Sequence, residues 1–216
     1  MTDGICYIVS AGDVCPSLLP RAKDGDIIIA ADAGFRALSD AGIEPDVFVG
    51  DGDSLGSIPD INERTVLECE KDDTDTEAAI KAGHERGYRR FVLIGARGGK
   101  RFSHSLANVA CLSLIAALGG EGVIADERCA IRLIKSGSSY RFGGFEGYFS
   151  LFPVGTEAVV SIGGAKYSGE NIALSAASTL GVSNETRGEC LVRAVSGDVL
   201  IVAEPTGDQK GELYFH

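Results

Sequence analysis

The chain has 216 residues, of which 44% are apolar, and its formal net charge is −11. This length suits one large domain or two modest ones, and the acidic balance disfavours nucleic acids and anionic membranes as main partners. No apolar run reaches transmembrane length, and no signal-peptide pattern opens the chain. The six cysteines are scattered without a Cys-x-x-Cys pair, which predicts buried thiols in a reducing cytoplasm.

Continuous apolar segments alternate with helical patterns over the first 126 residues. Strands are predicted at 5–9, 27–31, 47–49, 65–69, 91–94 and 123–125, and helices at 35–41, 76–86 and 106–118. Strands that are apolar throughout and alternate with helices indicate a parallel sheet covered on both faces. We therefore predict an N-terminal α/β domain over residues 1–126.

After residue 126 the pattern changes to short strands with Gly-rich turns between them. The predicted strands are 130–134, 139–142, 148–153, 158–162, 190–194 and 199–203, and no convincing helix appears. Such a pattern indicates a smaller all-β domain, predicted here as a β-sandwich over residues 127–216.

Acidic side chains follow three successive predicted strands, at the points where the strands end. In chain order they are Asp32, then Asp51 and Asp53, then Asp72 and Asp75. Because ligands of an open parallel sheet bind beyond the carboxyl ends of its strands, we expect these acids at one edge. Converging carboxylates repel one another unless a cation lies between them, and Mg²⁺ combines carboxylates with water and phosphate oxygens. Two alternatives stay open: solvated aspartates in a polar turn, and helix capping by Thr74 and Asp75.

The fifth predicted strand runs into a glycine-rich and basic segment, residues 95–104. Its glycines let the backbone approach a phosphate, and Arg97, Lys100 and Arg101 add positive charge beside it. The segment is not a P-loop, because no Ser or Thr follows the lysine and the spacing differs. Alone it reads as a basic turn before a helix. Beside an acidic metal cluster it fits the phosphate half of a metal–nucleotide site.

Several different short motifs lie along the chain in a defined order and spacing. They lie at 31–34, 50–54, 71–75, 98–104, 106–108, 164–167 and 180–185. On these motifs the chain resembles the thiamine pyrophosphokinase family over nearly its whole length. The resemblance implies an α/β domain followed by a β-sandwich, a homodimer, and transfer of a pyrophosphoryl group from ATP to the hydroxyethyl oxygen of thiamine, which leaves AMP.

The same resemblance assigns roles to residues of both predicted domains. Those expected around Mg²⁺ are Asp32, Asp51, Asp53 and Asp75, with Asp72 close by. Those expected toward the nucleotide are Gly98, Gly99, Arg101, His104 and Asn108. Those expected against thiamine, in a pocket shared by the two chains of the homodimer, are Tyr167, Ser183 and Asn184. Without the resemblance, Tyr167 reads equally well as a core or interface tyrosine, and 183–184 as an ordinary turn.

The segment before the third predicted helix departs from the family pattern Gly-Gly-Arg-x-Asp-His. Lys100 adds a residue, and Ser103 stands where an aspartate is expected. A serine hydroxyl cannot replace a carboxylate as an anion or proton acceptor at neutral pH. These departures favour one alternative function, a non-catalytic thiamine- or nucleotide-binding homologue. A separate alternative keeps the enzyme but changes the acceptor to another small alcohol such as a pterin, and Tyr167 with Ser183–Asn184 argues against it.

Overall fold

The computed structural model describes residues 2–56, 58–59, 61, 63–66, 73–99 and 101–206. The chain forms two compact units, Met1–Asp126 and Glu127–His216. Within the described ranges, no helix has both the length and the apolar character needed to span a bilayer.

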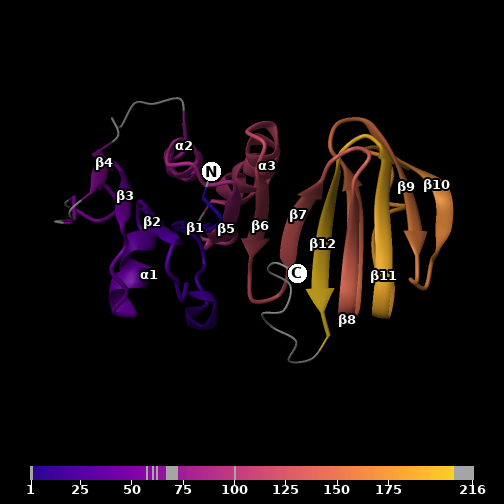
Figure 1. Ribbon diagram of the computed structural model, residues 1–216, viewed down its shortest axis with the longest axis horizontal. Coiled ribbons are helices and arrows are strands. Elements are labelled where there is room, and N and C mark those ends of the chain that lie inside the picture. The colour runs from indigo at the N-terminus through magenta and orange to yellow at the C-terminus, as the bar shows by residue number, and fades with distance from the viewer. Residues whose placement is uncertain are drawn as a thin grey trace. The chain divides into compact units, whose positions relative to one another are not determined.

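The first unit is built on a six-stranded parallel sheet (Figure 1). Its strands are β1 (Ile5–Val9), β2 (Ile27–Ala31), β3 (Val47–Gly50), β4 (Arg64–Val66), β5 (Arg90–Ile94) and β6 (Glu121–Ala125). Their order across the sheet is β6-β5-β1-β2-β3-β4. All five residues of β2 are buried, as are all four of β3, which fits strands covered on both faces. The predicted parallel α/β unit is confirmed.

The helices of this unit lie on both sides of the sheet. They are α1 (Gly34–Asp40), α2 (Asp75–Glu85) and α3 (Phe102–Ala117), and a short 3-10 turn, η1 (Pro16–Leu18), follows β1. Figure 1 shows α2 and α3 on one side and α1 on the other. Right-handed crossovers require this arrangement, because α1 connects strands in one direction across the sheet while α2 and α3 connect them in the other.

The order of strands reverses next to β1. The chain runs from β1 outward through β2, β3 and β4, and then returns to β5 on the other side of β1. Such a reversal leaves a crevice beyond the carboxyl ends of the two strands that flank it, and ligands of open α/β sheets bind there. A ligand site is therefore expected at the segments that follow β1 and β5.

The second unit is an antiparallel sheet in the order β10-β9-β11-β8-β12-β7 (Figure 1). Its strands are β7 (Ala130–Ile134), β8 (Ser139–Pro153), β9 (Glu157–Gly163), β10 (Gly169–Ser175), β11 (Asn184–Ser196) and β12 (Val199–Pro205). Cα atoms of β10 and β8 come within 8 Å of each other although two strands separate them in the order. The sheet therefore bends back on itself around buried side chains such as Phe142, Phe149 and Val192. The predicted all-β unit is confirmed.

Two predicted boundaries and one missed strand are corrected. The separate strands at 139–142 and 148–153 are parts of the single strand β8, which continues through Gly143 and Gly144. The prediction missed β10, most of whose residues are exposed or half-buried and show no apolar alternation. The predicted helix at 106–118 begins four residues earlier, because the polar first turn of α3 contributes no apolar pattern.

Candidate active site

Three of the predicted acids meet at the carboxyl edge of the parallel sheet. Asp32 follows β2, while Asp51 and Asp53 follow β3, and one carboxylate oxygen of each lies within 4.8 Å of the others. Asp75 is the first residue of α2 and does not belong to this three-carboxylate group among the described residues. Asp72 lies outside the described residues. We call Asp32, Asp51 and Asp53 the acidic group.

The backbone around Asp32 is shaped to bring this side chain to the edge. Asp32 has φ of +47°, in the left-handed region, and its N–H donates to the carbonyl oxygen of Val49 at 2.9 Å. Gly50 lies directly against it, since a Cβ there would be 3.1 Å from the Asp32 Cα. Asp and Asn tolerate this conformation better than most residues, and strained backbone of this kind concentrates at functional sites.

The acidic group contains a buried carboxylate oxygen whose hydrogen-bonding capacity is unused. Asp32 is only 7% exposed, and its Oδ1 has no hydrogen-bond partner in the described part of the chain. Asp53 is exposed, and its N–H donates to Asp51 Oδ1 at 3.0 Å. A buried carboxylate oxygen is costly unless a donor or a cation satisfies it. Three carboxylates around such an atom are the oxygen-rich donor set that a hard divalent cation prefers.

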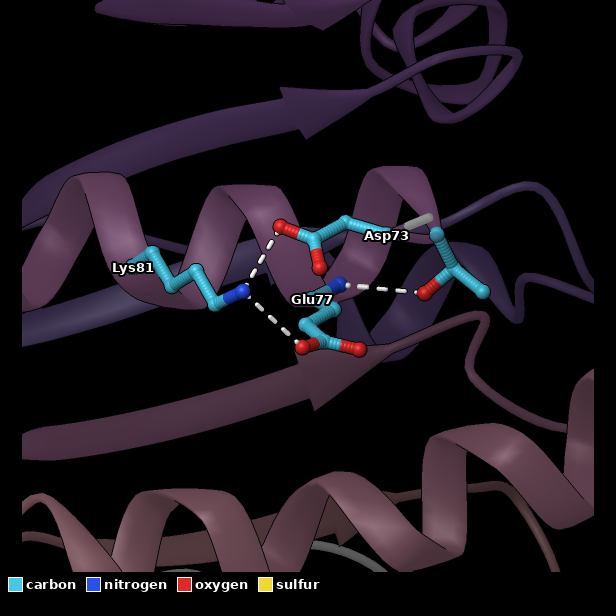
Figure 2. A network of polar contacts seen from close by, with 4 residues as sticks. Asp73, Glu77 and Lys81 are labelled. Carbon is cyan, nitrogen blue, oxygen red and sulfur yellow. Dashed lines mark hydrogen bonds and ion pairs between the residues drawn. The ribbon is translucent and has the colours of Figure 1, made fainter. Parts of the chain in front are cut away.

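The start of α2 is held by side-chain contacts that Figure 2 shows. Thr74 precedes the helix, and its hydroxyl accepts the Glu77 N–H at 3.2 Å, so Thr74 caps the helix. The Lys81 ammonium contacts Asp73 at 2.6 Å and Glu77 at 3.0 Å (Figure 2). The hydrogen bond from Lys81 lowers the pKa of Asp73. These contacts fix the two residues that precede Asp75 relative to the helix.

The segment after β5, residues 95–99, lies beside the turn after β1, residues 10–13. We call these segments the glycine loop and the β1 turn. The Gly12 N–H donates to the Gly95 carbonyl at 2.8 Å, and the Asp13 N–H donates to the Arg97 carbonyl at 2.9 Å. Gly98 has φ of +82°, and a Cβ there would lie 2.1 Å from Asp13 Oδ2. The glycine loop therefore runs along the switch point and requires glycine at 98.

The other predicted nucleotide residues lie in or near the first turns of α3. Asn108 is 7% exposed, and its Nδ2 donates to the Ala96 carbonyl at 2.8 Å, so its side chain holds the glycine loop from inside. Ser105, which the sequence analysis missed, does the same, because its Oγ accepts the Gly98 N–H at 3.1 Å. By contrast, Arg101 and His104 are exposed at the start of the helix.

The positive charge expected of this segment is smaller than the sequence indicates. Arg97 forms an ion pair with Asp126 at 2.5 Å, and the Asp126 side chain is nearly buried. Lys100 lies outside the described residues. Ser103 is exposed in the first turn of α3, as is Arg101 just before it. Of the two basic residues that the structure describes here, Arg97 is paired with Asp126 and Arg101 is exposed beside the glycine loop.

In the second unit, Asn184 connects the predicted thiamine residues. Its Oδ1 accepts the Tyr167 N–H at 3.0 Å, and its Nδ2 donates to the Tyr167 carbonyl at 2.8 Å. Tyr167 itself is 63% exposed. Ser183 is also exposed, with φ of +60°, and its N–H donates to Ser150 Oγ at 3.1 Å. Asn184 thus uses both polar atoms to present the exposed Tyr167 ring.

A charged pair lies next to Tyr167, formed by two motif residues to which the sequence analysis assigned no role. The Lys166 ammonium lies 5.7 Å from the centroid of the Tyr167 ring and 3.2 Å from a Glu185 oxygen. That hydrogen bond raises the pKa of Lys166, which therefore stays cationic. Glu185 also faces Tyr148 across the β8–β11 ladder, and Tyr148 is exposed. The surface thus combines two tyrosines with a balanced pair of charges.

Comparisons with known proteins bear on both units. A family model described as the catalytic domain of thiamin pyrophosphokinase matches residues 20–117. A second model, described as the vitamin B1 binding domain of the same enzyme, matches residues 133–197. No curated protein matches the chain significantly.

Solved structures agree over almost the full length. The chain is similar to thiamin pyrophosphokinase from Geobacillus thermodenitrificans, with 26% identity, a TM-score of 0.81 and coverage of 96% of this chain and 100% of the other. Thiamine pyrophosphokinase from Bacillus subtilis shares the fold, with 24% identity, a TM-score of 0.82 and coverage of 95% and 100%. The enzyme from Candida albicans shares it at 17% identity, with a TM-score of 0.75 and coverage of 94% and 89%. With both family domains present in order and matching most of its length, the chain belongs to the thiamin pyrophosphokinase family.

Proposed function

We propose that this thiamine diphosphokinase transfers a pyrophosphoryl group from ATP to the hydroxyl of thiamine at the carboxyl edge of its parallel sheet, yielding thiamine diphosphate and AMP. The observation that carries the site assignment is the acidic group, with the unsatisfied buried oxygen of Asp32, next to the switch point. The family supports the reaction, and this geometry supports the proposed location.

The acidic group is the proposed Mg²⁺ site. Asp32, Asp51 and Asp53 would hold the ion, and the expected fourth ligand is Asp75 at the start of α2. Bound Mg²⁺ would supply positive charge to phosphate oxygens, which a group of carboxylates cannot do alone. The protein's own part is to aim these oxygens, through the left-handed backbone of Asp32 and the cap that Thr74 gives to α2.

The glycine loop is the proposed phosphate site. Gly99 is exposed and leaves the backbone open to close approach, whereas Gly98 packs against Asp13, and Arg101 adds an exposed cation at the end of the loop. His104 is proposed to face the same ligand from the first turn of α3. Asn108 is proposed to act through the loop, because its side chain is directed to the Ala96 carbonyl.

Thiamine is proposed to bind against the exposed ring of Tyr167, with polar contacts from the Ser183–Asn184 segment. A thiazolium cation over an aromatic face gains ~0.5–2 kcal/mol. We further propose a homodimer, because small ligands bind in clefts at junctions and Tyr167 is 63% exposed in the single chain. The five described cysteines are free thiols, which supports a reducing, cytoplasmic location.

Ser103 favours a mechanism that depends on positioning and electrostatics rather than on a general base at this residue. Pyrophosphoryl donors react through transition states that are often loose, so the hydroxyl proton can leave late. The proton would then pass to water or to a remaining carboxylate such as Asp75. Ser103 and Lys100 are also the features that favour a non-catalytic binding homologue.

Steady-state assays of the parent protein and of Ser103→Asp, with thiamine saturating, separate these functions. We expect measurable turnover in the parent and a change in rate smaller than the ~10²–10⁴-fold worth of a general base in the variant. A silent parent that Ser103→Asp rescues would refute this mechanism. Tight thiamine binding without turnover in either protein would favour the binding homologue. Turnover with a pterin alcohol but not with thiamine would show a different acceptor.

A further inference from the structure

The β1 turn lies between the two halves of the proposed site. Three of its backbone N–H groups donate to carbonyl oxygens of residues 94–97, over distances of 2.8 to 2.9 Å. Gly12, at its centre, has no room for a side chain, since a Cβ would lie 2.4 Å from the Gly95 carbonyl oxygen. These hydrogen bonds therefore hold the backbone of the glycine loop in a fixed position against the β1 turn.

The first residue of the β1 turn also bonds to α2. Ser10 Oγ and Thr76 Oγ1 share a hydrogen bond of 2.9 Å, and the two residues are 2% and 6% exposed. Thr76 directly follows Asp75 in the first turn of the helix. Because each hydroxyl is shielded from water, either one left alone would be an unsatisfied buried group. The pair therefore specifies one position of the helix start against the sheet.

The other contacts at the start of α2 stabilise the helix itself rather than its position on the sheet. The Thr74 cap and the Lys81–Asp73 pair tie this segment to its own helix. The Ser10–Thr76 bond instead ties it to the end of β1, 66 positions away in the sequence. Apolar packing of Ala79 and Ile80 also holds α2 against the sheet, but such packing is less directional than a hydrogen bond, so the Ser10–Thr76 bond is what we expect to fix the first turn, and Asp75 with it.

We propose that Ser10 and Thr76 are positioning residues for pyrophosphoryl transfer. Their hydrogen bond holds the first turn of α2, and Asp75 with it, in register with the β1 turn that shapes the glycine loop. The carboxylate side and the phosphate side of the site are thereby kept at a fixed separation. Neither hydroxyl contacts a reacting atom. The inference rests on the proposed assignment of the glycine loop to the nucleotide phosphates.

Replacements at Thr76 separate positioning from general stability. Thr76→Val removes the hydroxyl while keeping the shape, and Thr76→Ser keeps the hydroxyl. The matched control is Ile80→Val, on the same helix, because Ile80 is fully buried and loses only a methylene group. For Thr76→Val we expect kcat to fall roughly ten- to a hundred-fold, a size consistent with small misplacement of reacting groups. Thr76→Ser and Ile80→Val should stay near the wild-type kcat.

Hydrogen–deuterium exchange of the ligand-free protein gives a readout that does not depend on turnover. Thr76→Val should speed exchange in peptides that cover 74–79 and 95–99, and Ser10→Ala should do the same. The double variant should be no worse than either single one, since each removes the same bond. Equal losses of kcat in Thr76→Val and Ile80→Val, or unchanged exchange at 95–99, would overturn the positioning role.

Arg101→Ala distinguishes failure of this inference from failure of the underlying assignment. An unchanged KM for ATP in Arg101→Ala would contradict the placement of phosphates at the glycine loop. A raised KM in Arg101→Ala, together with a normal kcat in Thr76→Val, would leave that placement standing and overturn the role of the Ser10–Thr76 pair alone.

Discussion

Asp32→Asn is expected to make the metal-free protein more stable and to remove its response to Mg²⁺. The side chain keeps its shape, and Asn tolerates the left-handed backbone at this position as well as Asp does. What disappears is one negative charge whose oxygen lies within 4.8 Å of two other carboxylates. Without a cation, repulsion between that charge and the other two carboxylates lowers the stability of the folded state.

The size of the effect follows from Coulomb's law. For one pair of unit charges at this separation, the repulsion is ~0.9 kcal/mol in a water-like dielectric and ~3.5 kcal/mol at an effective dielectric constant of 20. Taking ~1 kcal/mol as the lower end, the midpoint of thermal unfolding should rise by about 2–4 °C for a chain of this length. Wild type should instead gain about 2.7 kcal/mol when Mg²⁺ is present at 100 times its Kd. At this lower end, where the gain from Mg²⁺ exceeds the repulsion that the substitution removes, the order of stability of the two proteins reverses when Mg²⁺ is added; at either end, Mg²⁺ should stabilise wild type alone.

Thermal unfolding followed by circular dichroism, with KCl added to equalise ionic strength, measures this reversal. Asp40→Asn, an exposed change at the end of α1, is the charge-matched control and should respond to Mg²⁺ as wild type does. The reasoning would be refuted if metal-free Asp32→Asn were less stable than wild type, or if Mg²⁺ stabilised both proteins equally.

Changes at three further places have expected outcomes. Gly98→Ala should raise the KM for ATP about ten-fold or more in steady-state kinetics, because the added Cβ displaces the glycine loop. Gly119→Ala is the control: its backbone is equally strained, with φ of +77°, but nothing lies within 4 Å of an added Cβ, so its KM should not change. Equal effects of the two substitutions would show that the clash at Gly98 does not matter. Tyr167→Ala should weaken thiamine binding by ~0.5–2 kcal/mol in calorimetry and leave ATP binding unchanged, and a loss for both ligands would place the ring elsewhere. Glu185→Gln should weaken thiamine binding a few-fold because Lys166 loses its counter-charge, and Lys166→Gln should strengthen it by a similar factor, as expected of exposed pairs worth ~0.2–1 kcal/mol. Shifts of the same sign, or equal shifts with a neutral thiamine analogue, would contradict that charge balance.

The elements that the sequence predicts well are those whose signal is local. Buried parallel strands such as β2 read as unbroken apolar runs, and their ends are marked by the acids and glycines that follow. The convergence of Asp32 with Asp51 and Asp53 could be predicted because neighbouring parallel strands end at the same edge. Strand order was not needed for this inference, since consecutive strands commonly lie side by side.

The parts that the sequence does not predict depend on contacts between distant residues. The Ser10–Thr76 bond joins two unremarkable polar residues, and only the return of the chain to β5 brings α2 beside β1. Asn184 reads as a turn residue, but its side chain supports Tyr167 across 17 positions. The strand β10 is missed because it buries little of its surface, which leaves no apolar alternation to detect.

The transfer of a pyrophosphoryl group to thiamine is tested most directly with ATP labelled at the β-phosphate. The protein is incubated with labelled ATP, Mg²⁺ and thiamine, and the products are separated by chromatography, with Asp51→Asn as the site control. With the parent protein, the label is expected in thiamine diphosphate, and AMP should form in an equal molar amount. Asp51→Asn should lose most of this turnover, because the loss of one electrostatic contact commonly costs ~2.7–4 kcal/mol. Thiamine monophosphate with ADP, no product, or undiminished turnover in Asp51→Asn at saturating Mg²⁺ would contradict the account.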